Sequence, residues 1–135
     1  MPQLLPHLLL RCRTELASNS AIVLRAGGYA VTKAGDDELA LQVVAAGHVD
    51  GVVIELPMLH SIRFARLLDE LDPAVPVLIV TSWSEALRKA LPDMPLLPAE
   101  EIEDELVCAV DRILADYEIA LWQGQHGQQA SAGRS

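Results

Sequence analysis

The chain has 135 residues, which allows one domain with a substantial core and is too short for two domains of ordinary size. Its formal charge of −9, from 19 acidic and 10 basic residues, excludes the basic surface that nucleic-acid binding needs and disfavours an anionic membrane. Hydrophobic residues make up 51% of the chain but aromatic residues only 4%, so the core must be aliphatic, which suits a parallel sheet with helices on both faces.

The cellular compartment is predicted from the first residues and the cysteines. The amino terminus has no basic segment and is interrupted by Pro2 and Pro6, so we expect no targeting signal. No apolar stretch approaches the ~20 residues that cross a bilayer. The two cysteines, Cys12 and Cys108, do not make a disulfide framework. We therefore expect a reduced, cytoplasmic protein.

Short apolar runs alternate with helical patterns along the chain, which predicts an α/β fold. The central and strongest runs are bounded by prolines, and they are the length of strands rather than of helices. The predicted strands are, in chain order, Leu8–Cys12, Tyr29–Lys33, Gly51–Glu55, Val77–Thr81 and Met94–Leu97.

The first two predicted helices have recognisable ends. Thr14 and Asp36 can cap their amino termini through side-chain oxygens. Gly27-Gly28 and Gly47 can end them, because glycine readily adopts the left-handed conformation that follows many helices.

Three more helices are predicted in the second half. One follows Pro57, and one covers Trp83–Leu91, where Ser82 and Glu85 have the spacing of a capping box. The last starts near Ala99 with an acidic first turn, the charge that a helix amino terminus favours. Its apolar stripe is Ile102, Leu106, Val110, Ile113, Leu114, Tyr117 and Leu121.

These elements describe a single domain over residues 1–123, in the order βαβαβαβαβα. Residues 124–135 are polar and rich in glycine and glutamine, and we expect them to be disordered. The glycines form no phosphate-binding loop and the four histidines share no metal spacing, so no cofactor and no metal are expected. No nucleophile and base are arranged for catalysis, and we do not expect an enzyme.

Glu55 is the most informative residue, because it places a carboxylate at the end of the central buried strand. The carboxyl ends of strands are where open α/β sheets carry their sites. Around it, several residues occur in an order and spacing that resemble the receiver domain of two-component response regulators over roughly residues 7–116. These residues are Gly28-Tyr29, Asp50, Pro57-Met58, Thr81 and Pro98.

The resemblance implies a flavodoxin-like (βα)5 fold with the strand order 2-1-3-4-5 and a site between the first and third strands. It also implies a phosphorylation site whose residues differ here. Receivers hold Mg²⁺ with an acidic pair after the first strand, where this chain has Cys12 and Arg13. Glu55 stands at the phosphoacceptor aspartate and Leu97 at a lysine, and only Thr81 is retained.

Phosphorylation at Glu55 is therefore not expected. Neither Cys12 nor Arg13 is a hard oxygen ligand for Mg²⁺. Glutamate is also one methylene longer than aspartate, and a displacement of about 1 Å at a reacting atom is costly. We predict an atypical receiver, a pseudo-receiver, that lacks the phosphorylation chemistry.

The role of Glu55 is open between two alternatives. Its charge could imitate a phosphorylated aspartate, or it could be a structural carboxylate that pairs with Arg13, or with Arg11, where the metal would have been. At ~4 Å and an effective dielectric constant of ~20, such a pair attracts by about 4 kcal/mol before desolvation. For Cys12 we favour a small buried residue over a redox-sensitive thiol.

The resemblance implies a module of bacterial signal transduction. We expect it to stand alone, without an output domain, and therefore to act through protein–protein interaction. The expected partner is a signalling kinase, regulator or effector, or a second copy of the chain. Two alternatives are a phosphorylatable response regulator with unusual site residues, working in a phosphorelay, and a redox or small-molecule sensor on the same scaffold. In receivers the fourth helix, fifth strand and fifth helix meet partners, and here that surface is predicted to contain Trp83, Leu87, Met94, Val107, Tyr117 and Trp122.

Overall fold

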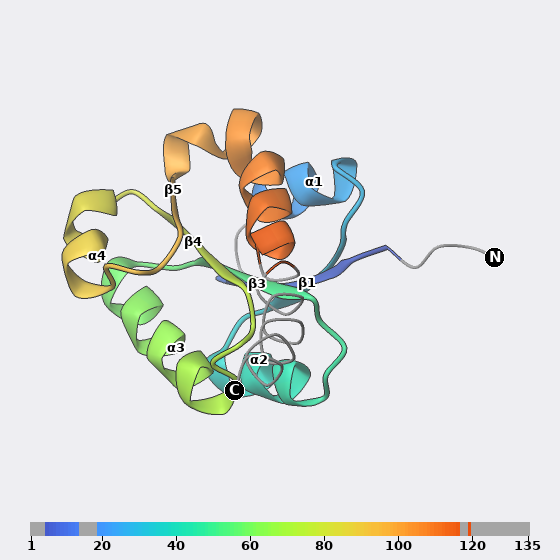
Figure 1. Cartoon of the computed structure of the whole chain (residues 1–135), viewed down its shortest axis with the longest axis horizontal. Helices are drawn as coiled ribbons and strands as arrows, with labels where there is room; N and C mark the ends of the chain where they lie inside the picture. Colours follow the sequence, from blue (N-terminus) through green and yellow to red (C-terminus); the bar gives the residue numbers. More distant parts are fainter. Residues whose placement is uncertain (1–4, 14–18, 117–118, 120–135) are drawn as a thin grey trace, which may run out of the picture.

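The computed structural model describes residues 5–13, 19–116 and 119, which form a five-stranded parallel sheet between two layers of helices (Figure 1). The strand order is β2-β1-β3-β4-β5, so the predicted flavodoxin-like receiver fold is confirmed. A helix over 102–116 follows the last labelled element. The elements are β1 (His7–Cys12), α1 (Asn19–Ala26), β2 (Ala30–Ala34), α2 (Asp37–Ala45), β3 (Gly51–Glu55), α3 (Met58–Leu71), β4 (Val77–Thr81), α4 (Ser84–Ala90), β5 (Leu96–Pro98) and the 3-10 helix η1 (Ala99–Glu101).

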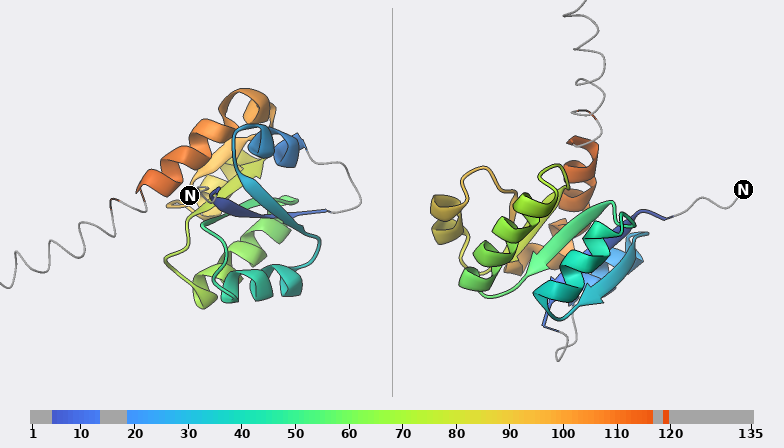
Figure 2. Two further views of the ribbon diagram at one scale, coloured as in Figure 1. Left: turned by 90° about the vertical axis from the view of Figure 1, so that its right-hand side faces the viewer. Right: turned by 90° about the horizontal axis from the view of Figure 1, so that it is seen from below.

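The sheet separates two hydrophobic clusters, one on each face. α1 and the helix over 102–116 cover one face, whereas α2, α3 and α4 cover the other (Figure 2). Side chains alternate along each strand, so Leu8, Leu10 and Cys12 of β1 enter the first cluster and Leu9 enters the second. This alternation decides which helices the residues at the end of β1 can reach.

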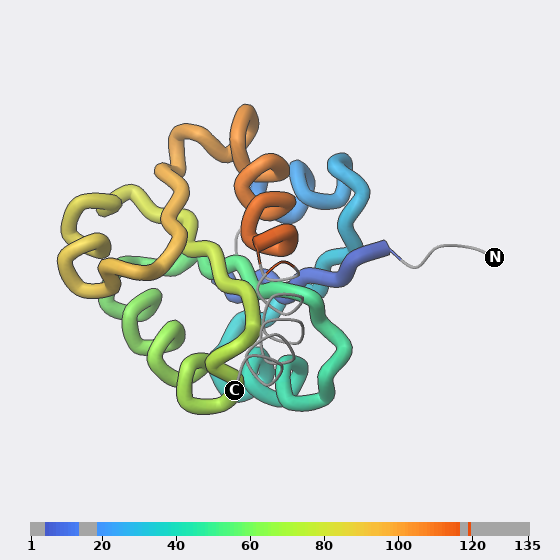
Figure 3. The backbone as a smooth tube through the Cα atoms, in the orientation of Figure 1, coloured from blue at the N-terminus to red at the C-terminus, as the bar shows by residue number. Residues whose placement is uncertain are grey.

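The last helix lies beside α1 over one face of the sheet (Figure 3). Gly27 permits this approach, because a Cβ atom there would lie 2.6 Å from a Cγ atom of Val107. The Tyr29 hydroxyl also donates a hydrogen bond to the Asp111 carboxylate of that helix.

The apolar stripe predicted for this helix is confirmed where the structure describes it. Leu106 and Val110 are fully buried, while Tyr117 and Leu121 lie outside the described residues.

Most predicted helix ends are confirmed. Asp36 caps α2 by accepting a 2.7 Å hydrogen bond from the Leu39 amide. Gly28 and Gly47 have φ angles of 98° and 78°, as expected for glycines that end helices. The predicted Thr14 cap lies outside the described residues.

The predicted capping box before α4 is wrong. Trp83 is the N-cap residue, and no side chain caps this helix. Instead, Thr81 Oγ1 accepts a 2.9 Å hydrogen bond from the Trp83 amide, which turns the chain at the end of β4 and delays the helix to Ser84. The start predicted near Ala99 is occupied by η1, and the α-helix begins at residue 102.

Among the residues that the structure describes, no helix has both the length and the apolar character needed to cross a membrane.

Candidate functional site

The sheet brings several of the predicted site residues to its carboxyl end. Cys12 and Glu55 are paired neighbours on β1 and β3. On the other side of β3, β4 and β5 place Val80 beside Leu97 and Thr81 beside Pro98. These positions therefore define one candidate site at the switch point between β1 and β3, where open α/β sheets bind ligands.

Glu55 is held by a residue that the sequence did not identify. Its side chain is half-buried, and the Ser20 hydroxyl donates a 2.5 Å hydrogen bond to Oε2. Ser20 is fully buried at the start of α1. The contact joins positions 35 residues apart and depends on how α1 packs, so no local pattern in the sequence predicts it.

The alternative in which Arg11 pairs with Glu55 is wrong. Arg11 alternates with Cys12 on β1, so its side chain lies on the face that α2 and α3 cover. There Arg11 Nε binds Asp37 Oδ1 at 2.8 Å, and the guanidinium lies 5.7 Å from the centre of the Phe64 ring. One guanidinium nitrogen also donates a 3.1 Å hydrogen bond to the Cys12 carbonyl oxygen.

Arg13 follows β1 and is exposed. The ion pair predicted between Arg13 and Glu55 stays a prediction.

Cys12 is buried, as we favoured, with 2% of its surface exposed. Burial raises the pKa of the Cys12 thiol, and the negative charge of Glu55 adds to this, while Lys33 and Arg11 act in the opposite direction. Lys33 was also not identified from the sequence. The second cysteine, Cys108, is exposed on the last helix.

A small hollow of about 210 Å³ opens beside Glu55. Thr81 and Trp83 contribute to its wall, and Thr81 is buried with its hydroxyl engaged by the Trp83 amide. Leu97 is buried in the core, so the position that corresponds to the receiver lysine is apolar and packed.

The described residues around Glu55 are not typical ligands of a Mg²⁺ ion. Its described neighbours include a neutral thiol at Cys12 and a hydroxyl at Ser20, whereas Mg²⁺ is usually held by carboxylates. Within residues 5–13 and 19–116, no group of three His, Cys, Asp or Glu side chains could hold a metal ion. Glu15 lies outside the described residues.

The residues predicted for a partner surface do not form one patch. Trp83 is 62% exposed beside the hollow. Leu87 is fully buried on the inner side of its own helix, α4, so the expectation that Leu87 contacts a partner is wrong. Leu87 was misplaced because a seven-residue helix turns its main apolar position inward.

Two other predicted surface residues lie apart from Trp83. Val107 packs against Gly27, and Met94 lies at the opposite end of the sheet from Trp83. Tyr117 and Trp122 lie outside the described residues.

No family model matches this chain, and no curated protein matches its sequence. Solved structures do match it. A response regulator receiver protein from Sinorhizobium medicae WSM419 is 21% identical with a TM-score of 0.64, covering 84% of this chain and 97% of that one. A receiver domain from Clostridium thermocellum is 16% identical with a TM-score of 0.72, covering 86% of this chain and 99% of that one.

A third match is the signal receiver domain of an HD domain-containing protein from Pseudomonas fluorescens Pf-5. It is 18% identical with a TM-score of 0.73, and the match covers 91% of this chain and 96% of that one. At these identities the likeness establishes a common fold. The chain has the receiver fold that its sequence resembles.

Proposed function

We propose that this protein is an atypical receiver that acts in bacterial signal transduction by binding a protein partner, without phosphorylation at Glu55 and without enzymatic activity. One observation carries the proposal. At the receiver's acceptor position, the Glu55 carboxylate is bound by Ser20 and adjoins the buried thiol of Cys12, where a phosphorylatable receiver has carboxylates.

The chemistry of phosphoryl transfer supports this reading. Transfer to a carboxylate needs a divalent cation to offset the charge on the transferring group. The neutral thiol of Cys12 is a poor ligand for Mg²⁺, which prefers oxygen. Leu97 is buried and apolar, so it offers no ammonium group to a phosphoryl group on Glu55, two strands away in the sheet.

The same contacts suggest what Glu55 does instead. The hydrogen bond from Ser20 joins the end of β3 to the first turn of α1, and hydrogen bonds to charged groups typically contribute about 1.5–3 kcal/mol. We infer that Glu55 fixes one conformation of the carboxyl end of the sheet. A receiver held in one conformation presents a constant surface to its partner.

The test is a ¹H–¹⁵N correlation spectrum of the full chain, titrated with Mg²⁺ and then with beryllofluoride, a mimic of the phosphoryl group. We expect the amides of Glu55, Thr81 and Trp83 to stay in place. A phosphorylatable receiver in the same buffers is the positive control, and its spectrum should change with both additions.

Saturable shifts of these three amides with Mg²⁺, and again with beryllofluoride, would refute the proposal. They would favour a phosphorylatable regulator with unusual site residues. The variant Ser20→Ala separates the structural role from chemistry, because it should shift the Glu55 amide and lower stability without creating any response to Mg²⁺.

A redox sensor is the second candidate. One matching structure is described as belonging to a family of redox sensors in the streptococci that evolved from two-component response regulators, with 17% identity and a TM-score of 0.70. That match covers 90% of this chain and 55% of the other. Cys12 stands at the site, but its burial and raised pKa disfavour the reactive thiolate. Reversible oxidation of Cys12 by peroxide, with spectral changes around Glu55, would favour this candidate.

A further inference from the structure

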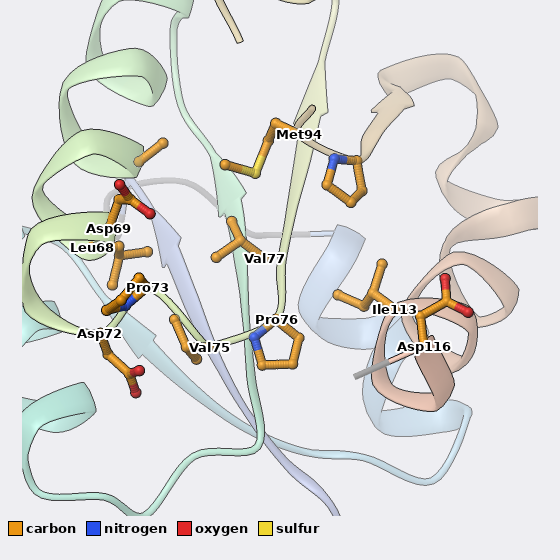
Figure 4. A pocket seen from close by; sticks show the side chains of 12 residues that line it. Leu68, Asp69, Asp72, Pro73, Val75, Pro76, Val77, Met94, Ile113 and Asp116 are labelled. Atoms are coloured by element: carbon orange, nitrogen blue, oxygen red, sulfur yellow. The ribbon is translucent and has the colours of Figure 1, made fainter. Parts of the chain in front are cut away.

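A larger hollow lies at the amino ends of β4 and β5 (Figure 4). Glu55 ends β3, so it lies at the opposite end of the sheet. The volume of the hollow is about 320 Å³, within the range of sites that bind small molecules or inserted side chains. The apolar lining comes from four separate parts of the fold and includes Leu68 of α3, Val77 of β4, Met94 before β5 and Ile113 of the last helix. We call this hollow the amino-end groove.

The walls of the amino-end groove are preformed. Pro73, Pro76 and Pro95 line it, and proline has a fixed φ and no amide hydrogen. The carbonyl oxygen of Pro76 accepts a 2.9 Å hydrogen bond from the Val52 amide, and that of Pro95 accepts a 3.0 Å hydrogen bond from the Ile79 amide. Because Pro76 and Pro95 are thus tied to the sheet, little ordering is needed when a ligand enters. Met94 adds a flexible, polarisable side chain that can adapt to different shapes.

The rim of the groove is acidic. Asp69, Asp72 and Asp116 line it, and none of its lining residues is basic. Within the described part of the chain, none of the three carboxylates makes an ion pair. Asp72 accepts a 3.2 Å hydrogen bond from the Ala74 amide, which shapes the turn after α3 but leaves its charge uncompensated.

The three carboxylates are also spread around the groove. Asp69 and Asp72 lie on the α3 side, and Asp116 lies across the hollow on the last helix (Figure 4). Several cations carried on one backbone can face both sides of the groove, with an apolar side chain between them in the hollow.

We propose that the amino-end groove binds a cationic amphipathic segment of a partner protein, in which an apolar anchor is flanked by Arg or Lys residues. The anchor fills the space between Leu68, Val77 and Met94, and the flanking cations face Asp69, Asp72 and Asp116. A buried anchor supplies affinity and charge complementarity supplies orientation and fast association. This proposal rests on the proposed function as an interaction module, and it names the partner's chemistry and the place where it binds.

The test uses the full ¹⁵N-labelled chain and a short synthetic peptide that has one phenylalanine between pairs of arginines. We expect saturable shifts of the Val77, Met94 and Ile113 amides, and none at Glu55 or Trp83. Two control peptides replace the phenylalanine by alanine or the arginines by glutamates, and each should bind at least about tenfold more weakly.

A pair of matched variants tests the rim. The double variant Asp69→Asn/Asp116→Asn should lower the affinity for the arginine peptide about tenfold and weaken its dependence on salt. The double variant Glu101→Gln/Glu103→Gln removes the same charge from exposed positions, one at the end of η1 and one in the first turn of the last helix. It should change the affinity less than about twofold. All four substitutions are at exposed positions, so both proteins should fold.

Three results would overturn the proposal. Equal losses in the two double variants would mean that the peptide responds only to net charge. Shifts centred on Glu55 and Trp83 would move the partner site to the other end of the sheet and leave the proposed function in place. The same groove shifts with spermidine alone, and with the alanine peptide, would mean that a simple cation is the occupant.

Discussion

Replacing Asp37 by alanine should lower the free energy of unfolding by about 3–4 kcal/mol, because it leaves the charge of Arg11 inside the protein without a counterion. The Arg11 side chain is 9% exposed and that of Asp37 is 23% exposed, and the two groups are 2.8 Å apart. Breaking a buried pair from one side typically costs 3–5 kcal/mol. The lower part of that range applies here, because Arg11 keeps its contacts with the Cys12 carbonyl and the Phe64 ring and because water reaches Asp37.

The assay is urea unfolding followed by far-ultraviolet circular dichroism, with the slope against urea unchanged between variants. Glu38→Ala is the matched control, because it removes the same charge from the same first turn of α2 at an exposed position. That loss of a favourable interaction with the helix amino terminus should cost only ~0.3–1 kcal/mol. Arg11→Met should cost less than Asp37→Ala, because methionine can pack on Phe64 without a charge. If Asp37→Ala and Glu38→Ala differ by less than about 1 kcal/mol, the buried pair does not hold β1 to α2, and the reasoning fails.

Three further predictions concern separate parts of the fold. Iodoacetamide should alkylate Cys12 far more slowly than Cys108 in the native protein, because burial and a raised pKa both suppress the Cys12 thiolate. The two cysteines should react equally fast in urea, and fast alkylation of Cys12 in the native protein would contradict this prediction. The pKa of Tyr29 is raised, chiefly by burial and also by its hydrogen bond to a carboxylate. The contribution of Tyr29 to stability is therefore complete below about pH 10 and is lost at higher pH, and Tyr29→Phe should make this loss of stability at alkaline pH smaller. Gly27→Ala should destabilise the fold by ~1–3 kcal/mol, because the added methyl group clashes with Val107. Adding Val107→Ala should restore part of the lost stability in thermal unfolding, and no restoration would mean that the strain lies elsewhere.

The strands could be predicted because their signals are local. β3 and β4 have the predicted bounds, since each is an uninterrupted apolar run next to a proline or glycine. Alternation along β1 already contained the information that Arg11 and Cys12 face opposite layers, although the proposed pairing of Arg11 with Glu55 ignored it. The candidate site was harder, because Ser20 reaches Glu55 through the packing of α1, and Lys33 comes near Cys12 through the pairing of β1 with β2. Contacts of this kind join residues far apart in the chain, and they carry no pattern that a single sequence reveals.

The brevity of β5 has a consequence for how copies of this protein could meet. Outer strands with free backbone groups can recruit a strand from another molecule, and proteins suppress this with short strands and prolines. β5 has three residues, and Pro95 precedes it while Pro98 ends it, so almost no amide hydrogen is available for a sixth strand. Growth of the sheet from one molecule into the next is blocked on this side. Any assembly that extends beyond β5 has to be built from helical faces, and substitutions meant to disrupt such an assembly belong there.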